Sequence, residues 1–89
     1  DDQIHARDMV WLEECDAVVA EVTTPSLGVG YELGVAEKLG KPILCLFDAG
    51  NSDFRLSAML SGNPKVTVAR YKALADATEA MNRFIQQNK

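Results

Sequence analysis

Short apolar runs alternate along this chain with segments whose apolar residues recur at helical spacing. Runs typical of strands occupy residues 17–22, 42–47 and 65–70; the first two are almost continuously apolar and the third alternates. Helical spacing covers residues 4–15 and 29–39. A last helix follows, with one face formed by Leu74, Ala77, Met81, Phe84 and Ile85. Continuous apolar runs predict strands buried on both faces, and the alternating run predicts an edge strand.

Strands that alternate with helices predict an α/β fold: a parallel sheet with flanking helices in three layers, Rossmann-like or flavodoxin-like. Residues 48–53 have loop composition and residues 55–60 predict a short helix. With 89 residues the chain forms one domain, residues 1–89. Its first element is a helix and it has few strands, so we expect that it lacks an N-terminal strand. Ligands of such sheets bind at the carboxyl ends of the strands.

The segment of residues 25–34 follows the first strand and combines a hydroxyl-bearing turn with a glycine-rich helix start. Backbone N–H groups at such a position can hold an anion, which favours a phosphorylated ligand. The Gly-x-Gly-x-x-x-Gly spacing matches neither a dinucleotide fingerprint nor a Walker loop, so no cofactor is predicted. The structural alternative is that Gly28 and Gly30 form a turn and Gly34 lets the helix approach the sheet.

Two carboxylates are predicted to point inward from neighbouring helices. Asp8 lies four residues from both Ile4 and Leu12, which places it in the apolar stripe. Glu32 shares a face with Val29 and other apolar residues of its helix. Carboxylate pairs of this kind carry out glycosidic chemistry, in which one group attacks the anomeric carbon and the other manages a proton. The alternatives are an exposed N-terminal helix charge for Asp8, and an ion pair or cap for Glu32.

Other candidate groups have plainer interpretations. His5 is one residue off the stripe and is predicted to be partly exposed, whereas Trp11 is predicted to lie in the core. Cys15 and Cys45 lack metal-type spacing and are predicted to be small apolar residues without a disulfide. No metal site is expected.

Charge and composition narrow the classes of partner. The net charge is −4 with scattered Lys and Arg residues, which argues against binding to a nucleic-acid polymer. A single nucleotide can still be held by backbone amides and by the hydroxyls of residues 23–26. Neither a membrane span nor a signal peptide is evident, so we expect a soluble intracellular protein without membrane contact, located in the cytoplasm and also the nucleus.

Several segments together resemble the 2′-deoxynucleoside 5′-phosphate N-hydrolases of the nucleoside 2-deoxyribosyltransferase superfamily. The resemblance covers most of the chain up to Met59, and the glycine-rich segment is its most specific part. It is carried by Asp8 with Trp11-Leu12, and by residues 16–23, 25–34, 43–47 and 56–59. The family's initial strand and glycine-rich loop, which supply a tyrosine near the sugar, are absent here.

The resemblance implies roles for individual residues. Glu32 corresponds to the nucleophile that forms a covalent deoxyribosyl-enzyme, and Asp8 to the carboxylate that protonates or positions the leaving base. Ser26 and Gly28 correspond to residues that hold the 5′-phosphate. Ser57 corresponds to a serine that reaches this phosphate from the other subunit of a homodimer, and Met59 to a position close to the base.

The resemblance therefore implies hydrolysis of deoxynucleoside 5′-monophosphates. Neutral hydroxyls in the turn of residues 23–26 tolerate a phosphate dianion, where carboxylates would repel it. Two alternatives stay open at this point. One is transfer of the deoxyribosyl group to a second base, and the other is a non-catalytic domain that only binds nucleotides or another protein.

Overall fold

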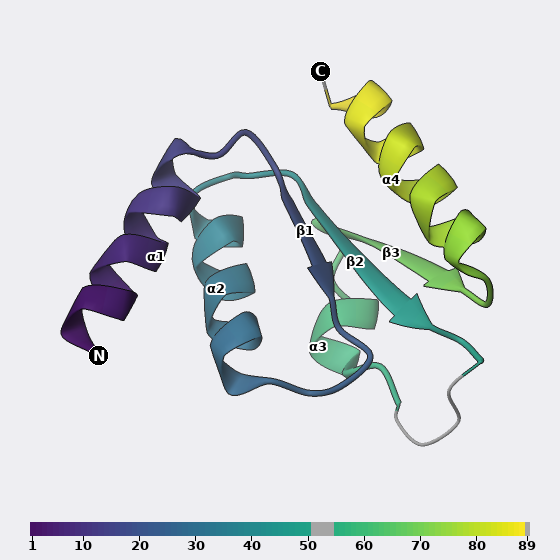
Figure 1. The fold of residues 1–89 in the computed structure, drawn as a ribbon, viewed down its shortest axis with the longest axis horizontal. Coiled ribbons are helices and arrows are strands. Elements are labelled where there is room, and N and C mark those ends of the chain that lie inside the picture. Colours follow the sequence, from purple (N-terminus) through teal and green to yellow (C-terminus); the bar gives the residue numbers. More distant parts are fainter. Residues whose placement is uncertain (51–54, 89) are drawn as a thin grey trace.

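The computed structural model describes residues 1–50 and 55–88 and shows alternating helices and strands (Figure 1). Three of the seven elements in this described part of the chain are strands. In chain order the elements are α1 (Asp2–Glu14), β1 (Val18–Glu21), α2 (Leu27–Lys38), β2 (Ile43–Asp48), α3 (Ala58–Ser61), β3 (Val66–Tyr71) and α4 (Leu74–Gln87). None of these helices is long and apolar enough to cross a membrane.

The strands form one parallel sheet in the order β1-β2-β3. Val19 pairs with Leu44, which in turn pairs with Thr67, so the carboxyl ends of all three strands meet at one edge. The predicted parallel α/β fold is confirmed, and the alternating third strand lies at an edge of the sheet as expected. The prediction that the first run is buried on both faces is wrong: β1 lies at the other edge of the described sheet, none of its residues is buried, and Val19 is 42 % exposed.

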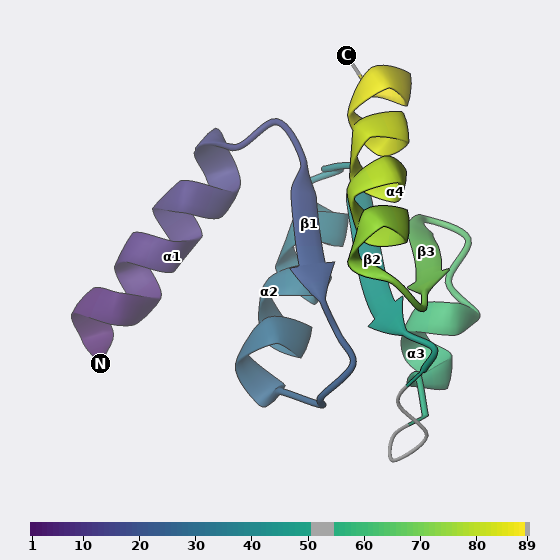
Figure 2. The ribbon, with the colours of Figure 1, turned by 45° about the vertical axis from the view of Figure 1, so that its right-hand side comes forward.

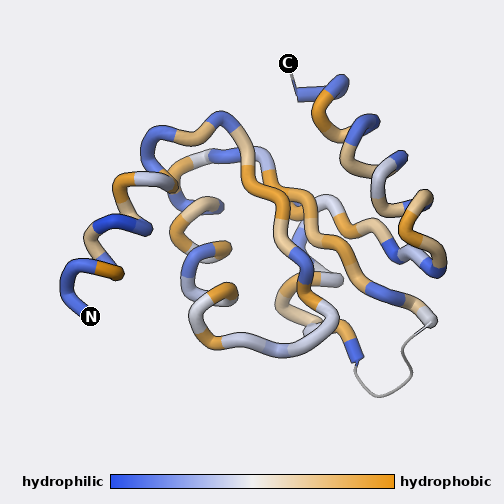
Figure 3. Tube along the Cα trace, in the orientation of Figure 1, coloured by the Kyte–Doolittle hydropathy of each residue, from blue (hydrophilic) through white to orange (hydrophobic). Residues whose placement is uncertain are grey.

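Helices cover both faces of the sheet, which gives the three predicted layers (Figure 2). Ile43 and Cys45 of β2 pack on the side of α1 and α2, whereas Leu44 and Leu46 pack against α4. All four side chains are buried, which explains why β2 is the most continuously apolar segment of the chain (Figure 3). Burial on both faces selects a continuous apolar run over an alternating one.

The glycine-rich segment is helical. Ser26 is the N-cap of α2, and its Oγ accepts a hydrogen bond from the N–H of Val29 at 3.3 Å. A serine in this position satisfies one of the amides that the first helical turn leaves free. Gly28 and Gly30 therefore do not form the alternative turn. Gly34 does not mark a close approach either, because a Cβ there meets nothing within 4 Å.

The N-terminal helix differs from its prediction. Trp11 is 58 % exposed, and Leu12 is the residue of α1 that is buried. The prediction of a core tryptophan is wrong because the contact of α1 with α2 is narrow. Leu12 occupies it, and the neighbouring Trp11 lies outside it. The guanidinium of Arg7 lies 4.6 Å from the centre of the Trp11 ring. His5 is exposed, as expected.

The short third helix begins later than predicted. It starts at Ala58 because Ser57 caps it, with the Ser57 Oγ accepting from the N–H of Met59 at 3.2 Å. Of the predicted loop, residue 48 belongs to β2, and residues 51–54 lie outside the described part of the chain. Both cysteines are free, and Cys45 is buried as predicted.

We predict that Gly40→Ala lowers the free energy of unfolding by about 1 to 2 kcal/mol, because φ at Gly40 is +73° and L residues disfavour this region. Gly40 ends α2, where its N–H bonds the Glu37 carbonyl. The matched control is Gly34→Ala, inside the same helix, which should gain up to about 1 kcal/mol. Urea denaturation measures both. Equal effects of the two substitutions would contradict the assignment.

Candidate active site

The packing of α1 on α2 brings the two predicted carboxylates together. The pKa of Glu32 is raised by burial, by the negative charge of Asp8 and by a hydrogen bond between the two side chains. Asp8 and Glu32 therefore lie against each other, and both side chains are partly buried.

The two carboxyl groups have different surroundings. Asp8 lies 3.5 Å from the Nε of Arg7, measured from its Oδ1, and that arginine stacks on Trp11. A second contact between the helices joins His5 to the hydroxyl of Tyr31, at 3.5 Å. Partial burial of Glu32 opposes charge on that group.

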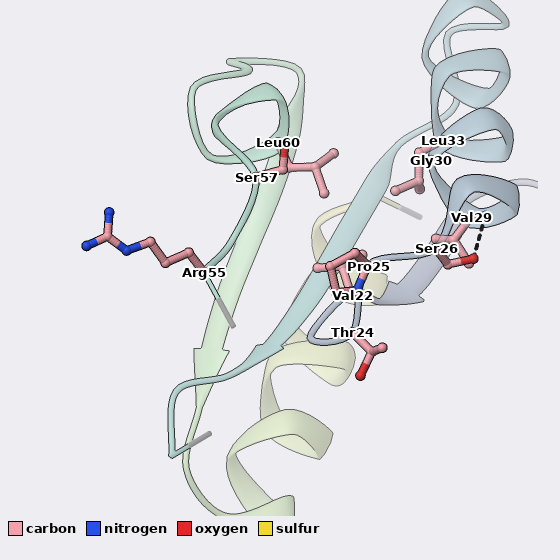
Figure 4. Close-up of a pocket in the computed structure, with 10 residues that line it drawn as sticks. All are labelled: Val22, Thr24, Pro25, Ser26, Val29, Gly30, Leu33, Arg55, Ser57 and Leu60. Atoms are coloured by element: carbon pink, nitrogen blue, oxygen red, sulfur yellow. Dashed lines mark hydrogen bonds between the residues drawn. The ribbon is translucent and has the colours of Figure 1, made fainter. Parts of the chain in front are cut away.

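A pocket of about 200 Å³ lies at the carboxyl end of β1 (Figure 4). Its polar lining residues are the hydroxyl-bearing Thr24, Ser26 and Ser57, together with Arg55. The remaining lining residues are Val22, Pro25, Val29, Gly30, Leu33 and Leu60. Among the described residues, the lining contains one cation and no carboxylate, which favours an anion over a cation.

The start of α2 forms one wall of this pocket. Ser26 Oγ bonds the N–H of Val29, and the Ser26 carbonyl accepts from Gly30. The amides of Leu27 and Gly28, which precede the first intrahelical bond, remain for water or a ligand. Gly30 lines the pocket, and a Cβ there would meet nothing within 4 Å, so its missing side chain leaves space.

The predicted site residues fall into two neighbouring groups and one outlier. Ser26 and Ser57 of the same chain line the pocket from different sides, with Gly28 next to Ser26 (Figure 4). Glu32 lies in an adjoining hollow of about 280 Å³ that also contains Glu21. Val29 and Leu33 line both hollows and form the wall between them. Met59 is 81 % exposed and lines neither.

Some residues at the site were not predicted. Arg55 lines the pocket rim, with its guanidinium directed outward (Figure 4). Its position two residues before Ser57 was the available signal. Thr23 was expected among the anion-holding hydroxyls, but its Oγ1 is buried and accepts from the N–H of Asp48 at 2.8 Å. Thr24 takes the place at the pocket instead.

The described residues do not favour a metal site or a reactive thiol. Within residues 1–50 and 55–88, no three His, Cys, Asp or Glu side chains cluster in a way that could hold a metal ion. Burial raises the pKa of the Cys45 thiol, which disfavours the reactive thiolate. The chemical potential of the site lies in its carboxyl pair.

The fold and site define a class: a parallel α/β domain with a carboxyl pair beside an anion-compatible pocket. The sequence pattern of the nucleoside 2-deoxyribosyltransferase family matches residues 1–84. The chain belongs to this family.

Known relatives carry related names. The chain is 49 % identical over 76 residues to a Syntrophotalea carbinolica protein named as a 2′-deoxynucleoside 5′-phosphate N-hydrolase, which covers 85 % of this chain and 53 % of that protein. It is 64 % identical over 62 residues to the mouse 5-hydroxymethyl-dUMP N-hydrolase, covering 70 % of this chain and 35 % of the mouse protein. The chain thus spans about half or less of the length of these relatives.

A solved structure supports the fold. A CMP N-glycosidase from Clostridium botulinum superimposes with a TM-score of 0.75 at 24 % sequence identity. The match covers 91 % of this chain and 73 % of the other. At this level of identity the similarity establishes a shared architecture.

We predict that Glu32→Gln stabilises the protein at pH 7. The raised pKa of Glu32 means that the folded state binds its proton more tightly than the unfolded state. The tighter proton binding adds to the free energy of unfolding at pH values below the ordinary glutamate pKa. This contribution is lost as the pH rises through the pKa that Glu32 has in the folded protein. Glutamine removes the cost of ionising this partly buried group.

Thermal unfolding between pH 3 and pH 8 tests this expectation. The Tm advantage of Glu32→Gln should be largest above the folded pKa and should shrink as the pH falls. The control is Glu79→Gln on α4, whose carboxylate forms an exposed ion pair with Arg83 at 2.7 Å. A wild type that is more stable than Glu32→Gln at pH 7 would contradict burial of Glu32 against Asp8.

Proposed function

We propose that the protein hydrolyses the N-glycosidic bond of 2′-deoxynucleoside 5′-monophosphates and releases the free base and 2-deoxyribose 5-phosphate. The observation that carries this proposal is that the hollow containing Glu32, which lies against Asp8, adjoins a pocket whose described lining has three hydroxyls and no carboxylate. Family membership and the names of the bacterial and mouse relatives support it.

In this proposal the 5′-phosphate occupies the pocket at the start of α2. The hydroxyl of Ser26 and the amides of Leu27 and Gly28 donate hydrogen bonds to its oxygens. The positive end of the α2 dipole adds to these bonds. Val29 and Leu33 line both the phosphate pocket and the hollow that contains Glu32. The sugar of the nucleotide then lies over these two side chains, between the bound phosphate and the carboxyl pair.

Glu32 and Asp8 then divide the chemistry. A carboxylate oxygen of Glu32 attacks C1′, the C1′–N bond breaks, and its electron pair goes to the base nitrogen. The base takes up the proton that the carboxyl pair holds, delivered through Asp8. Water then attacks C1′ of the glycosyl ester, which gives 2-deoxyribose 5-phosphate, frees the Glu32 carboxylate and returns a proton to the pair.

We predict that Glu32→Gln slows base release by at least ~10³ while nucleotide affinity changes little, because the amide cannot attack C1′. Chromatography of the bases released from dGMP and from deoxyguanosine measures this rate and the preference for phosphate. Adding a second free base distinguishes hydrolysis from deoxyribosyl transfer.

The matched control is Glu37→Gln, five residues further along α2, which should keep the wild-type rate. Near-normal release by Glu32→Gln would remove the nucleophile role. Equal or faster turnover of deoxyguanosine would remove the phosphate argument, and exchange without net hydrolysis would make the protein a transferase. Nucleotide binding without base release by the wild type would indicate a binding domain.

We further propose a homodimer in which α3 of one subunit completes the site of the other through Ser57 and Met59. The high exposure of Met59 supports this proposal, because a methionine near the base needs a partner to cover it. The outer side of α2 offers a largely apolar groove of about 370 Å³ for a second subunit, next to Gly30, Gly34 and Leu39.

Mixing two inactive chains tests the shared site. In heterodimers of Glu32→Gln with Ser57→Ala, one site contains neither lesion if Ser57 acts across the interface. Activity should then partly return at low substrate concentration, because loss of a charge-assisted hydrogen bond weakens phosphate binding about ten- to a hundredfold. Absence of recovery despite proven subunit exchange would mean that Ser57 serves its own chain, where it already lines the pocket.

A further inference from the structure

A chain of hydrogen bonds ties the ends of all three strands together, next to the pocket but outside it. The Tyr71 hydroxyl, at the end of β3, donates to Oε2 of Glu21, at the end of β1. Glu21 Oε1 accepts from the N–H of Thr23 at 2.6 Å. Thr23 Oγ1 accepts from the N–H of Asp48 at the end of β2, at 2.8 Å. We call Glu21, Thr23 and Tyr71 the strand-end clamp.

The clamp fixes one residue of the pocket wall. Thr23 is only 8 % exposed and is held through both its amide and its hydroxyl. Its neighbours Val22 and Thr24 both line the pocket, and Ser26 follows two residues later. Because Thr23 is fixed and lies only three residues before Ser26, the backbone of residues 23–26 has little conformational freedom. The position of Thr23 therefore limits where Ser26 can cap α2.

The charge of Glu21 is suited to this task. Partial burial raises its pKa, but hydrogen bonds from Thr23 and Tyr71 outweigh burial and leave the pKa below the ordinary value. An ionised carboxylate accepts both bonds with the assistance of its charge, so each is stronger than a bond to a neutral side chain. Glu21 is absent from the lining of the proposed phosphate pocket, so its charge does not face the anion directly.

We propose that Glu21, oriented by Tyr71, is a positioning residue that holds the turn of residues 23–26 in the geometry that binds phosphate. This proposal rests on the proposed function for the identity of the anion. The clamp itself is defined by contacts within the protein, and its role therefore has a readout that needs no activity.

Tyr71→Phe removes the hydroxyl and keeps the ring, and Glu21→Gln keeps the shape of the side chain. Loss of one such bond is expected to weaken affinity for 2-deoxyribose 5-phosphate about five- to tenfold, with affinity for unphosphorylated deoxyribonucleoside unchanged. For Tyr71→Phe, which leaves the hollow around Glu32 unchanged, the corresponding enzyme effect is a raised KM for the monophosphate at a nearly constant kcat. Amide hydrogen exchange at Thr23 should accelerate in both variants.

The matched control is Thr78→Val, which removes a hydroxyl bond to the Leu74 carbonyl in α4, 3.2 Å long, and touches neither the turn nor the pocket. Thr78→Val should lower the stability modestly, as the clamp variants do. It should change neither the affinity for phosphate nor the rate of amide hydrogen exchange at Thr23. A merely structural role for the clamp predicts the same pattern in all three variants, with equal Tm losses and unchanged discrimination between phosphorylated and unphosphorylated ligands. That pattern would overturn the proposal.

The two proposals fail in different ways. If the wild type neither binds 2-deoxyribose 5-phosphate nor releases base, the proposed function is wrong. The clamp is then judged by Thr23 exchange and by affinity for inorganic phosphate. If the wild type binds the sugar phosphate and both clamp variants bind it equally well, the positioning role is wrong and the proposed function stands.

Discussion

The contact between α1 and α2 is the constraint on which the rest of the site depends. Leu12 of α1 and Leu33 of α2 belong to the same buried cluster, which extends to Ile43 and Cys45 of the central strand. This packing sets Asp8 against Glu32 and raises the pKa of the latter. Without it, α2 would still present a capped N-terminus, but Glu32 would be an ordinary surface glutamate.

Much of the fold could be predicted because its signals are local. The apolar run of β2 reflects burial on both faces, and Gly40 ends α2 with the positive φ that glycine tolerates. The inward position of Asp8 followed from helical spacing alone. Ser26 could be placed at a turn from its neighbours, although its exact role as the N-cap moved the start of α2 two residues earlier than expected.

The errors and omissions concern contacts between distant residues. The periodicity of α1 does not show how narrow its contact with α2 is, and so the exposure of Trp11 was missed. The bond between Glu21 and Tyr71 joins residues 50 positions apart, and no local pattern signals it. Thr23 looks like a ligand-binding hydroxyl in the sequence, and only strand pairing shows that its partner is the Asp48 amide.

The central claim is that Asp8 and Glu32 act as one coupled pair. Carbon-13 NMR titration of the Glu32 carboxyl, in the wild type and in Asp8→Asn, tests it most directly. The account predicts a wild-type Glu32 that titrates above the ordinary glutamate pKa, and a downward shift in Asp8→Asn, where the neighbouring charge is lost. A Glu32 titration that is the same in both proteins, or that is ordinary in the wild type, would contradict the coupling.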